Sequence, residues 1–149
     1  MLPVSAAPHI VVLKADRFDG ERIYRQIKSL WINSQVKVFQ HGLDALISIR
    51  AAKPDLFITG VYIEDMDGLQ HLEPFIKCDL PILVVTARKD ARTFRLLRNL
   101  RYDGIFDAAA EGMGKLQLAM DEVMEHQLYI SSSLVPHIEK PKPIAPQEN

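Results

Sequence analysis

Short apolar segments alternate with longer segments of helical periodicity along most of the chain. Most of the apolar segments are nearly continuous, which is typical of strands buried on both faces of a sheet, and one alternates between apolar and polar positions. Together they predict strands near residues 9–13, 35–40, 56–59, 81–86 and 103–106. This pattern therefore favours a five-stranded sheet.

Between the strands, apolar residues recur three or four positions apart, as on the buried face of an amphipathic helix. This spacing predicts helices near residues 19–30, 43–52, 69–77, 90–100 and 112–127. Asp90 is predicted to cap the fourth helix. Because strands and helices alternate, we expect an α/β protein with a doubly wound parallel sheet, joined by right-handed crossovers and covered by helices on both faces.

Composition narrows the class of protein but does not identify it. The chain has 149 residues, of which 48% are hydrophobic and 25% are charged, as in an ordinary globular domain. Its net charge of −1 gives no general attraction to nucleic acid or to an anionic membrane. The single cysteine, Cys78, excludes an internal disulfide. With no apolar segment of transmembrane length and no secretory signal in residues 1–8, we expect a protein without a membrane partner.

The segment 53–69 carries the most informative motifs. Pro54-Asp55-Leu56 leads into a buried strand, and Met66-Asp67-Gly68 forms a turn before the next helix. This combination resembles the centre of a bacterial response-regulator receiver domain, a CheY-like module. The resemblance covers roughly residues 9–127 and implies the flavodoxin-like (βα)5 fold, with strand order 2-1-3-4-5 and the site at the carboxyl ends of the strands. Residues 1–8 are then an N-terminal arm. The resemblance, more than the composition, also implies a cytoplasmic location.

The end of the chain resembles another part of some response regulators. Residues 128–135 are similar to the segment that opens a linker helix after the receiver in LuxR-type regulators, with Ser132 in place of the family's proline. Prolines are frequent from Pro136 onward, which is typical of a linker. We therefore expect a linker helix and a Pro-rich tail over residues 128–149. Whether a DNA-binding domain follows stays open.

The receiver site itself is predicted to be degenerate. In the family, an acidic pair and a phospho-accepting aspartate hold Mg²⁺, while a hydroxyl and a lysine bind the phosphoryl group. The resemblance places these five positions, in that order, on Ala15, Asp16, Gly60, Thr86 and Ala108. Only one carboxylate and the hydroxyl remain, and Lys14 stands in a usually apolar position. We therefore expect no catalytic residue, no metal site, no cofactor and no enzymatic activity.

Two of the retained residues also have structural interpretations. Asp16 is more readily interpreted as a polar residue at a strand end that pairs with Lys14 or Arg17. Thr86 is equally compatible with ordinary β-branched packing in a strand.

Charge is unevenly distributed over the last two predicted helices. The fourth is basic and the fifth is acidic on its outer side, which predicts either two solvated faces or a self-complementary interaction surface. This surface, which we call the charged surface, comprises Arg92, Arg95, Arg98, Arg101, Asp121, Glu122 and Glu125.

The sequence thus predicts a pseudo-receiver, a phosphorylation-independent protein-interaction module of bacterial two-component signalling or transcription regulation. We expect a homodimer and a protein partner of unknown identity, without direct nucleic-acid contact. Two alternatives remain. One is a phosphotransfer-competent response regulator with an unorthodox acceptor. The other is a nucleotide- or nucleic-acid-binding regulator that uses the arginine-rich fourth helix.

Overall fold

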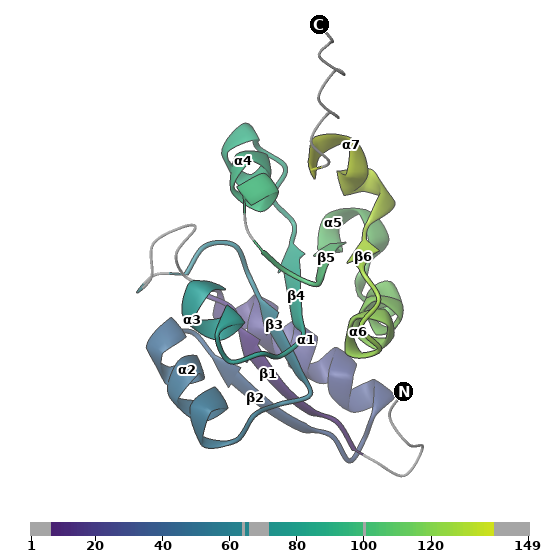
Figure 1. Ribbon diagram of the computed structural model, residues 1–149. Helices are drawn as coiled ribbons and strands as arrows, with labels where there is room; N and C mark the ends of the chain where they lie inside the picture. The colour runs from purple at the N-terminus through teal and green to yellow at the C-terminus, as the bar shows by residue number, and fades with distance from the viewer. Residues whose placement is uncertain (1–6, 64, 66–71, 100, 139–149) are drawn as a thin grey trace, which may run out of the picture.

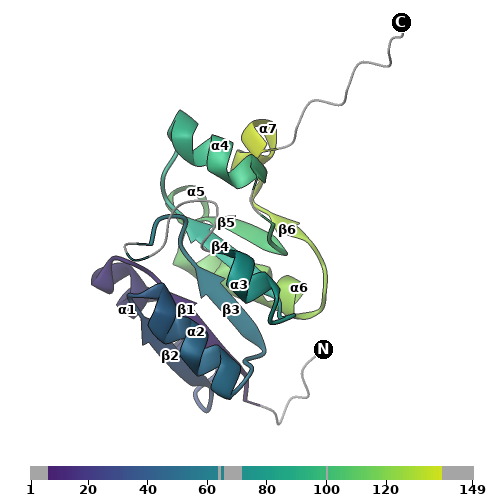
Figure 2. The ribbon, with the colours of Figure 1, turned by 60° about the vertical axis from the view of Figure 1, so that its left-hand side comes forward.

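A parallel sheet forms the centre of the molecule, in the order β2-β1-β3-β4-β5-β6 (Figures 1 and 2). The computed structural model describes residues 7–63, 65, 72–99 and 101–138. The strands are β1 (His9–Leu13), β2 (Gln35–Phe39), β3 (Leu56–Thr59), β4 (Ile82–Thr86), β5 (Gly104–Asp107) and β6 (Tyr129–Ile130). The predicted α/β class and 2-1-3-4-5 order are confirmed. The prediction of five strands is corrected, because β6 adds a short sixth strand parallel to β5.

Helices cover both faces of the sheet. They are α1 (Arg17–Leu30), α2 (Gly42–Ala51), α3 (Glu73–Ile76), α4 (Ala91–Asn99), α5 (Ala108–Glu111), α6 (Leu116–Met124) and α7 (Val135–Ile138). Two 3₁₀ turns, η2 (Met113–Lys115) and η3 (Ser132–Leu134), precede α6 and α7. The apolar faces of α1 and α6 pack in one hydrophobic cluster, and those of α2, α3, α4 and α7 pack in the other.

The central strands form the core because they are apolar on both faces. Every residue of β3, β4 and β5 is buried. Phe57 of β3 stacks on Phe75 of α3 with their ring centroids 4.3 Å apart. Among the described residues, none of the helices has the length and apolar character needed to cross a membrane.

The last predicted helix, 112–127, is observed as η2 and α6, which ends at Met124, and the short helix α5 precedes it. Asp107 accepts hydrogen bonds from the backbone N–H groups of Ala109 and Ala110, so helical structure begins earlier than the predicted residue 112. Gly112 then has a positive φ of 73°, which ends this first turn before α6 begins. The Asp90 cap is observed as predicted, because its carboxylate accepts a hydrogen bond from the Thr93 N–H at 2.8 Å.

The segment after α6 packs on the domain and does not begin as the predicted linker helix. Its residues 129–130 form β6, because the Ser131 N–H bonds to the Ile105 carbonyl and continues the pairing with β5. Leu134 and Ile138 are 0% and 7% exposed, so they belong to the core. Residues 139–149, most of the predicted arm, and the predicted helix start at 69–71 lie outside the described residues.

Candidate functional site

The parallel strands bring the five receiver-site positions to one edge of the sheet. Leu13 is in register with Thr59, and Thr86 with Asp107, so the residues that follow these strand ends are neighbours. The positions gathered there are Ala15, Asp16, Gly60, Thr86 and Ala108. The order of the strands thus explains how side chains far apart in the sequence share one edge.

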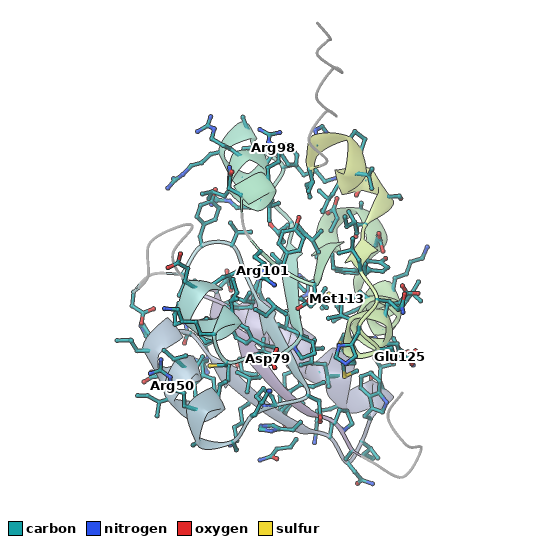
Figure 3. All side chains as sticks on the ribbon, in the orientation of Figure 1. Arg50, Asp79, Arg98, Arg101, Met113 and Glu125 are labelled. Atoms are coloured by element: carbon teal, nitrogen blue, oxygen red, sulfur yellow. The ribbon has the colours of Figure 1, made fainter. Side chains whose placement is uncertain are left out.

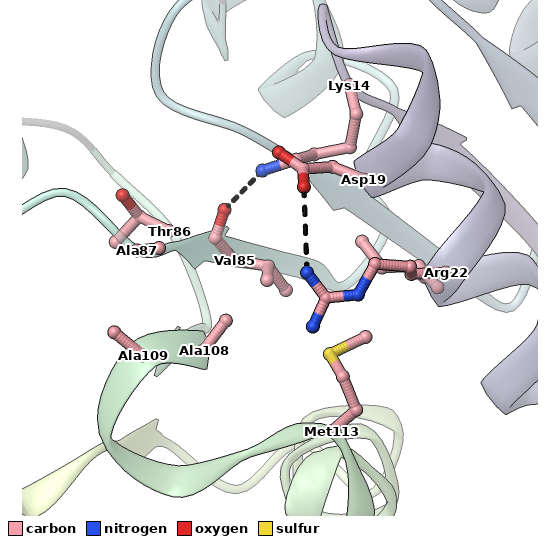
Figure 4. A pocket seen from close by; sticks show the side chains of 10 residues that line it. Lys14, Asp19, Arg22, Val85, Thr86, Ala87, Ala108, Ala109 and Met113 are labelled. Atoms are coloured by element: carbon pink, nitrogen blue, oxygen red, sulfur yellow. Dashed lines mark hydrogen bonds and ion pairs between the residues drawn. The ribbon is translucent and has the colours of Figure 1, made fainter.

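The side chain of Lys14 fills the space above Gly60. A Cβ atom at residue 60 would lie 3.2 Å from Lys14 Nζ and 3.3 Å from Lys14 Cδ, which is closer than ordinary packing allows. The Lys14 ammonium is held there by donating a hydrogen bond of 2.9 Å to the Val85 carbonyl (Figure 4). An amine from the residue that follows β1 therefore lies beside the position that the resemblance assigns to the phospho-accepting carboxylate.

The environment of Lys14 disfavours its charged form. Desolvation by burial lowers the pKa of Lys14, and the nearby negative charges of Asp19 and Asp16 only partly oppose this. Asp19 also forms a long ion pair with Arg22, with 3.9 Å between oxygen and nitrogen. The sequence identified Lys14 as unusual at this position, but the strand pattern alone did not indicate that its side chain would turn toward Gly60.

Asp16 acts as the N-terminal cap of α1. Its Oδ1 accepts hydrogen bonds from the backbone N–H groups of Phe18 at 2.8 Å and Asp19 at 3.3 Å. Arg17, one of its two expected partners, instead pairs with Glu21. Capping alone gives Asp16 a structural role, because loss of such a cap typically costs ~1 kcal/mol.

Thr86 also makes a local contact. Its side chain is buried, and its Oγ1 accepts a hydrogen bond from the Arg88 N–H at 3.1 Å. This contact fixes the start of the loop from β4 to α4, as Thr hydroxyls commonly do at turns.

Asp107, next to Ala108, is the most connected polar residue at this edge. It accepts hydrogen bonds from Ser133 at 2.7 Å and from the first turn of α5, and it forms a 3.0 Å ion pair with Lys89. Burial alone would raise the pKa of Asp107, but the hydrogen bonds from Ser133 and Lys89 outweigh it, so the pKa lies below its ordinary value. The sequence did not single out this residue, because its main partners come from distant segments.

These residues do not fit the Mg²⁺ ion of receiver domains. Mg²⁺ needs several oxygen ligands, whereas Ala15 and Gly60 offer no side-chain oxygen. The Lys14 ammonium places a cation beside the same position. Within the described residues, no group of three His, Cys, Asp or Glu side chains has a geometry that could hold a metal ion.

The two halves of the charged surface lie on different parts of the molecule. All four arginines are exposed, and Arg98 donates a hydrogen bond of 2.9 Å to the His137 carbonyl of α7. His137 also stacks on Phe94 of α4, with ring centroids 4.2 Å apart. Figure 3 places Arg98 on α4 and Glu125 at the end of α6, in different parts of the molecule. The self-complementary contact stays a prediction, and α7 occupies one side of α4.

Comparison with known proteins identifies the fold. No family model matches the sequence, and no curated protein matches it either. Solved structures do match. The isolated receiver domain of RcsB from Salmonella enterica serovar Typhimurium, solved with phosphomimetic BeF3-, has a TM-score of 0.71 at 13% identity, over 90% of this chain and 100% of that one.

Two further structures show the same similarity. The signal receiver domain of a modulated diguanylate cyclase from Desulfovibrio desulfuricans G20 has a TM-score of 0.64 at 20% identity, covering 82% of this chain and 100% of that one. CheY4 of Vibrio cholerae, a chemotaxis response regulator, has a TM-score of 0.65 at 14% identity, covering 79% of this chain and 99% of that one. The chain therefore has the fold of a response-regulator receiver domain.

Proposed function

We propose that this chain is a pseudo-receiver, a cytoplasmic and non-enzymatic module of bacterial signalling that binds a protein partner without being phosphorylated. The observation that supports this most directly is the Lys14 side chain, whose ammonium lies beside the vacant acceptor position at Gly60. The receiver fold supports a role in signalling, and the residues at the carboxyl ends of the strands support the absence of phosphorylation.

The local chemistry opposes phosphotransfer at three points. Gly60 offers no nucleophile, and Ala108 offers no cation for the phosphoryl oxygens. Asp16 already accepts two backbone hydrogen bonds as a helix cap. Since a buried amine stands in the acceptor position, the domain is proposed to hold one conformation, where an ordinary receiver alternates between two.

The partner is proposed to contact the exposed part of α4. Arg88, which precedes α4, and Arg92, in its first turn, both lie over the ring of Tyr62, 4.7 and 5.2 Å from its centroid, so the start of this helix presents two cations beside an aromatic ring. A second copy of the chain offers Asp121, Glu122 and Glu125 as acidic contacts. Because exposed ion pairs contribute only about 0.2–1 kcal/mol each, these charges would mainly orient the partner and would add little to the binding affinity.

Phosphodonor treatment tests the central part of the proposal. The protein is incubated with Mg²⁺ and acetyl phosphate, and its intact mass is measured alongside an active receiver as a positive control. The expected result is no phosphoryl adduct. An adduct that maps to residues 59–67 would contradict the proposal and favour a response regulator with an unorthodox acceptor.

Light scattering at increasing salt tests the association. We expect a dimer that weakens as salt rises and that is lost when Arg95 and Arg98 are both changed to Glu. Changing Asp121 and Glu125 to Lys in the same protein should restore it. A monomer at all concentrations would contradict the homodimer. A salt-dependent affinity for DNA that disappears in the same arginine variant would favour the nucleic-acid-binding alternative.

A further inference from the structure

A cavity of about 210 Å³ opens beside the Gly60 position. It lies between α1, the ends of β1 and β4, and the short helix α5 (Figure 4). At ~30 Å³ per molecule of liquid water, this is the space of about seven waters. The cavity is large enough for a small organic molecule.

The cavity owes its space to small side chains. Ala87, Ala108 and Ala109 form one wall, where a long side chain on residue 108 would fill the space. Ile23, Val85 and Met113 form the other apolar walls. A cavity with walls of this kind favours a ligand that has an apolar body.

The charged groups of the cavity carry a net positive charge. Lys14 and Arg22 contribute two cations, and Asp19 contributes one anion. In Figure 4 the Arg22 guanidinium reaches toward the space between Asp19 and Met113, while Lys14 points to the Val85 carbonyl. Since an ammonium has three N–H donors, and the described residues supply Lys14 with this one acceptor, Lys14 can donate to a further group.

We propose that this cavity binds a small organic monoanion, with its carboxylate at Lys14 and Arg22 and its apolar body against Ile23 and Met113. A second negative charge on the ligand would face Asp19, which disfavours dianions. The bound carboxylate would form a direct ion pair with the buried ammonium, which no carboxylate of the described residues does. A ligand of this class would then bind at the carboxyl ends of the strands, where receiver domains take a phosphoryl group. The inference goes beyond the proposed function and does not depend on the partner surface.

NMR titration of the full chain with sodium benzoate at constant ionic strength tests the inference. Benzoate is a monocarboxylate with a compact apolar body, and benzamide and inorganic phosphate serve as comparison probes. We expect saturable shifts of the backbone amides of Lys14, Arg22, Val85, Ala108 and Met113 with benzoate. Benzamide should bind at least tenfold more weakly, because it lacks the charge. Equal binding of benzamide, or tighter binding of inorganic phosphate, would overturn the assignment to an organic monoanion.

Two variants with matched controls locate the site. Lys14→Met removes the cation and Ala108→Leu fills the cavity, and each should weaken benzoate binding at least tenfold. Lys115→Met and Ala110→Leu make the same changes at exposed positions outside the cavity and should leave binding unchanged. The proposal is overturned if no saturable shifts occur, or if both test variants bind benzoate as the unchanged protein does. Because no phosphodonor is used, this result is independent of the phosphorylation test.

Discussion

Restoring an aspartate at residue 60 should create a buried ion pair before it creates a phosphorylation site. The Cβ atom introduced by Gly60→Asp would lie 3.2 Å from the Lys14 ammonium nitrogen, so the new carboxylate and the ammonium would be forced into contact. The contact involves the far end of a flexible side chain, and a shift of a few tenths of an ångström relieves it. We therefore expect Gly60→Asp to fold.

The size of this interaction can be bounded. Two unit charges 4 Å apart attract each other by about 4 kcal/mol at an effective dielectric constant near 20. Burying the carboxylate costs several kcal/mol, so the net change in the free energy of unfolding for Gly60→Asp alone is expected to be small. The coupling between the two residues is the larger quantity, and we expect it to be roughly 2–4 kcal/mol and favourable.

A double-mutant cycle measures the coupling. Urea unfolding is followed by circular dichroism for the unchanged protein, Gly60→Asp, Lys14→Met and the double variant. In the double variant the new carboxylate has no cation beside it, so this protein should be the least stable. Gly60→Ala controls for the steric contact. A coupling below ~0.5 kcal/mol would refute the view that Lys14 occupies the acceptor position. Phosphorylation-driven dimerisation of Gly60→Asp would refute it as well, since Lys14 should block the site.

Three further predictions concern the ionisable groups of the fold. Because the pKa of Lys14 is lowered in the folded protein, the unfolded chain binds more protons between the folded pKa and 10.5, so the free energy of unfolding should rise with pH in this interval. Lys14→Met should remove this rise and should stabilise the protein at pH 7 by on the order of 1 kcal/mol, as measured by urea unfolding. Asp65 accepts hydrogen bonds from the N–H groups of Gly42 and Leu43 at the start of α2, so Asp65→Ala should cost ~1 kcal/mol at pH 7. Its lowered pKa means that this difference should be present above 3.8 and vanish as the pH falls through the folded value, and a difference that persists at low pH would contradict the assignment. Asp107→Asn should destabilise the protein by about 1.5–3 kcal/mol and speed hydrogen exchange in residues 129–138, whereas Ser133→Ala, which removes one of its hydrogen bonds, should cost only about 1 kcal/mol.

The sheet and most of its helices could be predicted because their signals are local. The apolar runs at 9–13 and 81–86 are nearly continuous, and the motif around Pro54 located the third strand. The segment Tyr129–Ile130 was not predicted as a strand, because two residues carry no periodicity and pairing with β5 is decided by tertiary contacts. The early start of helical structure at Ala108 was missed for a similar reason, since the cap on Asp107 was not recognised.

The sequence indicated which groups of a receiver site are missing, but it did not indicate how the residues that are present lie relative to one another. Reading Gly60 and Ala108 against the receiver pattern showed which groups were missing. The direction of the Lys14 side chain could not be read from the sequence, because it depends on the Val85 carbonyl, 71 residues away along the chain. The cavity likewise depends on which small residues from separate elements face one another.

The packing of the last described segment has a consequence for synthesis. Leu134 and Ile138 belong to the same hydrophobic cluster as Val11 and Leu13 of the first strand. A nascent chain that has emerged only as far as residue 127 therefore exposes apolar surface on α4 and along the edge of β5. Exposed surfaces of this kind make partly synthesised proteins prone to aggregate. The hydrophobic cluster of the first strand is therefore completed only when Ile138, the last described residue, has been synthesised.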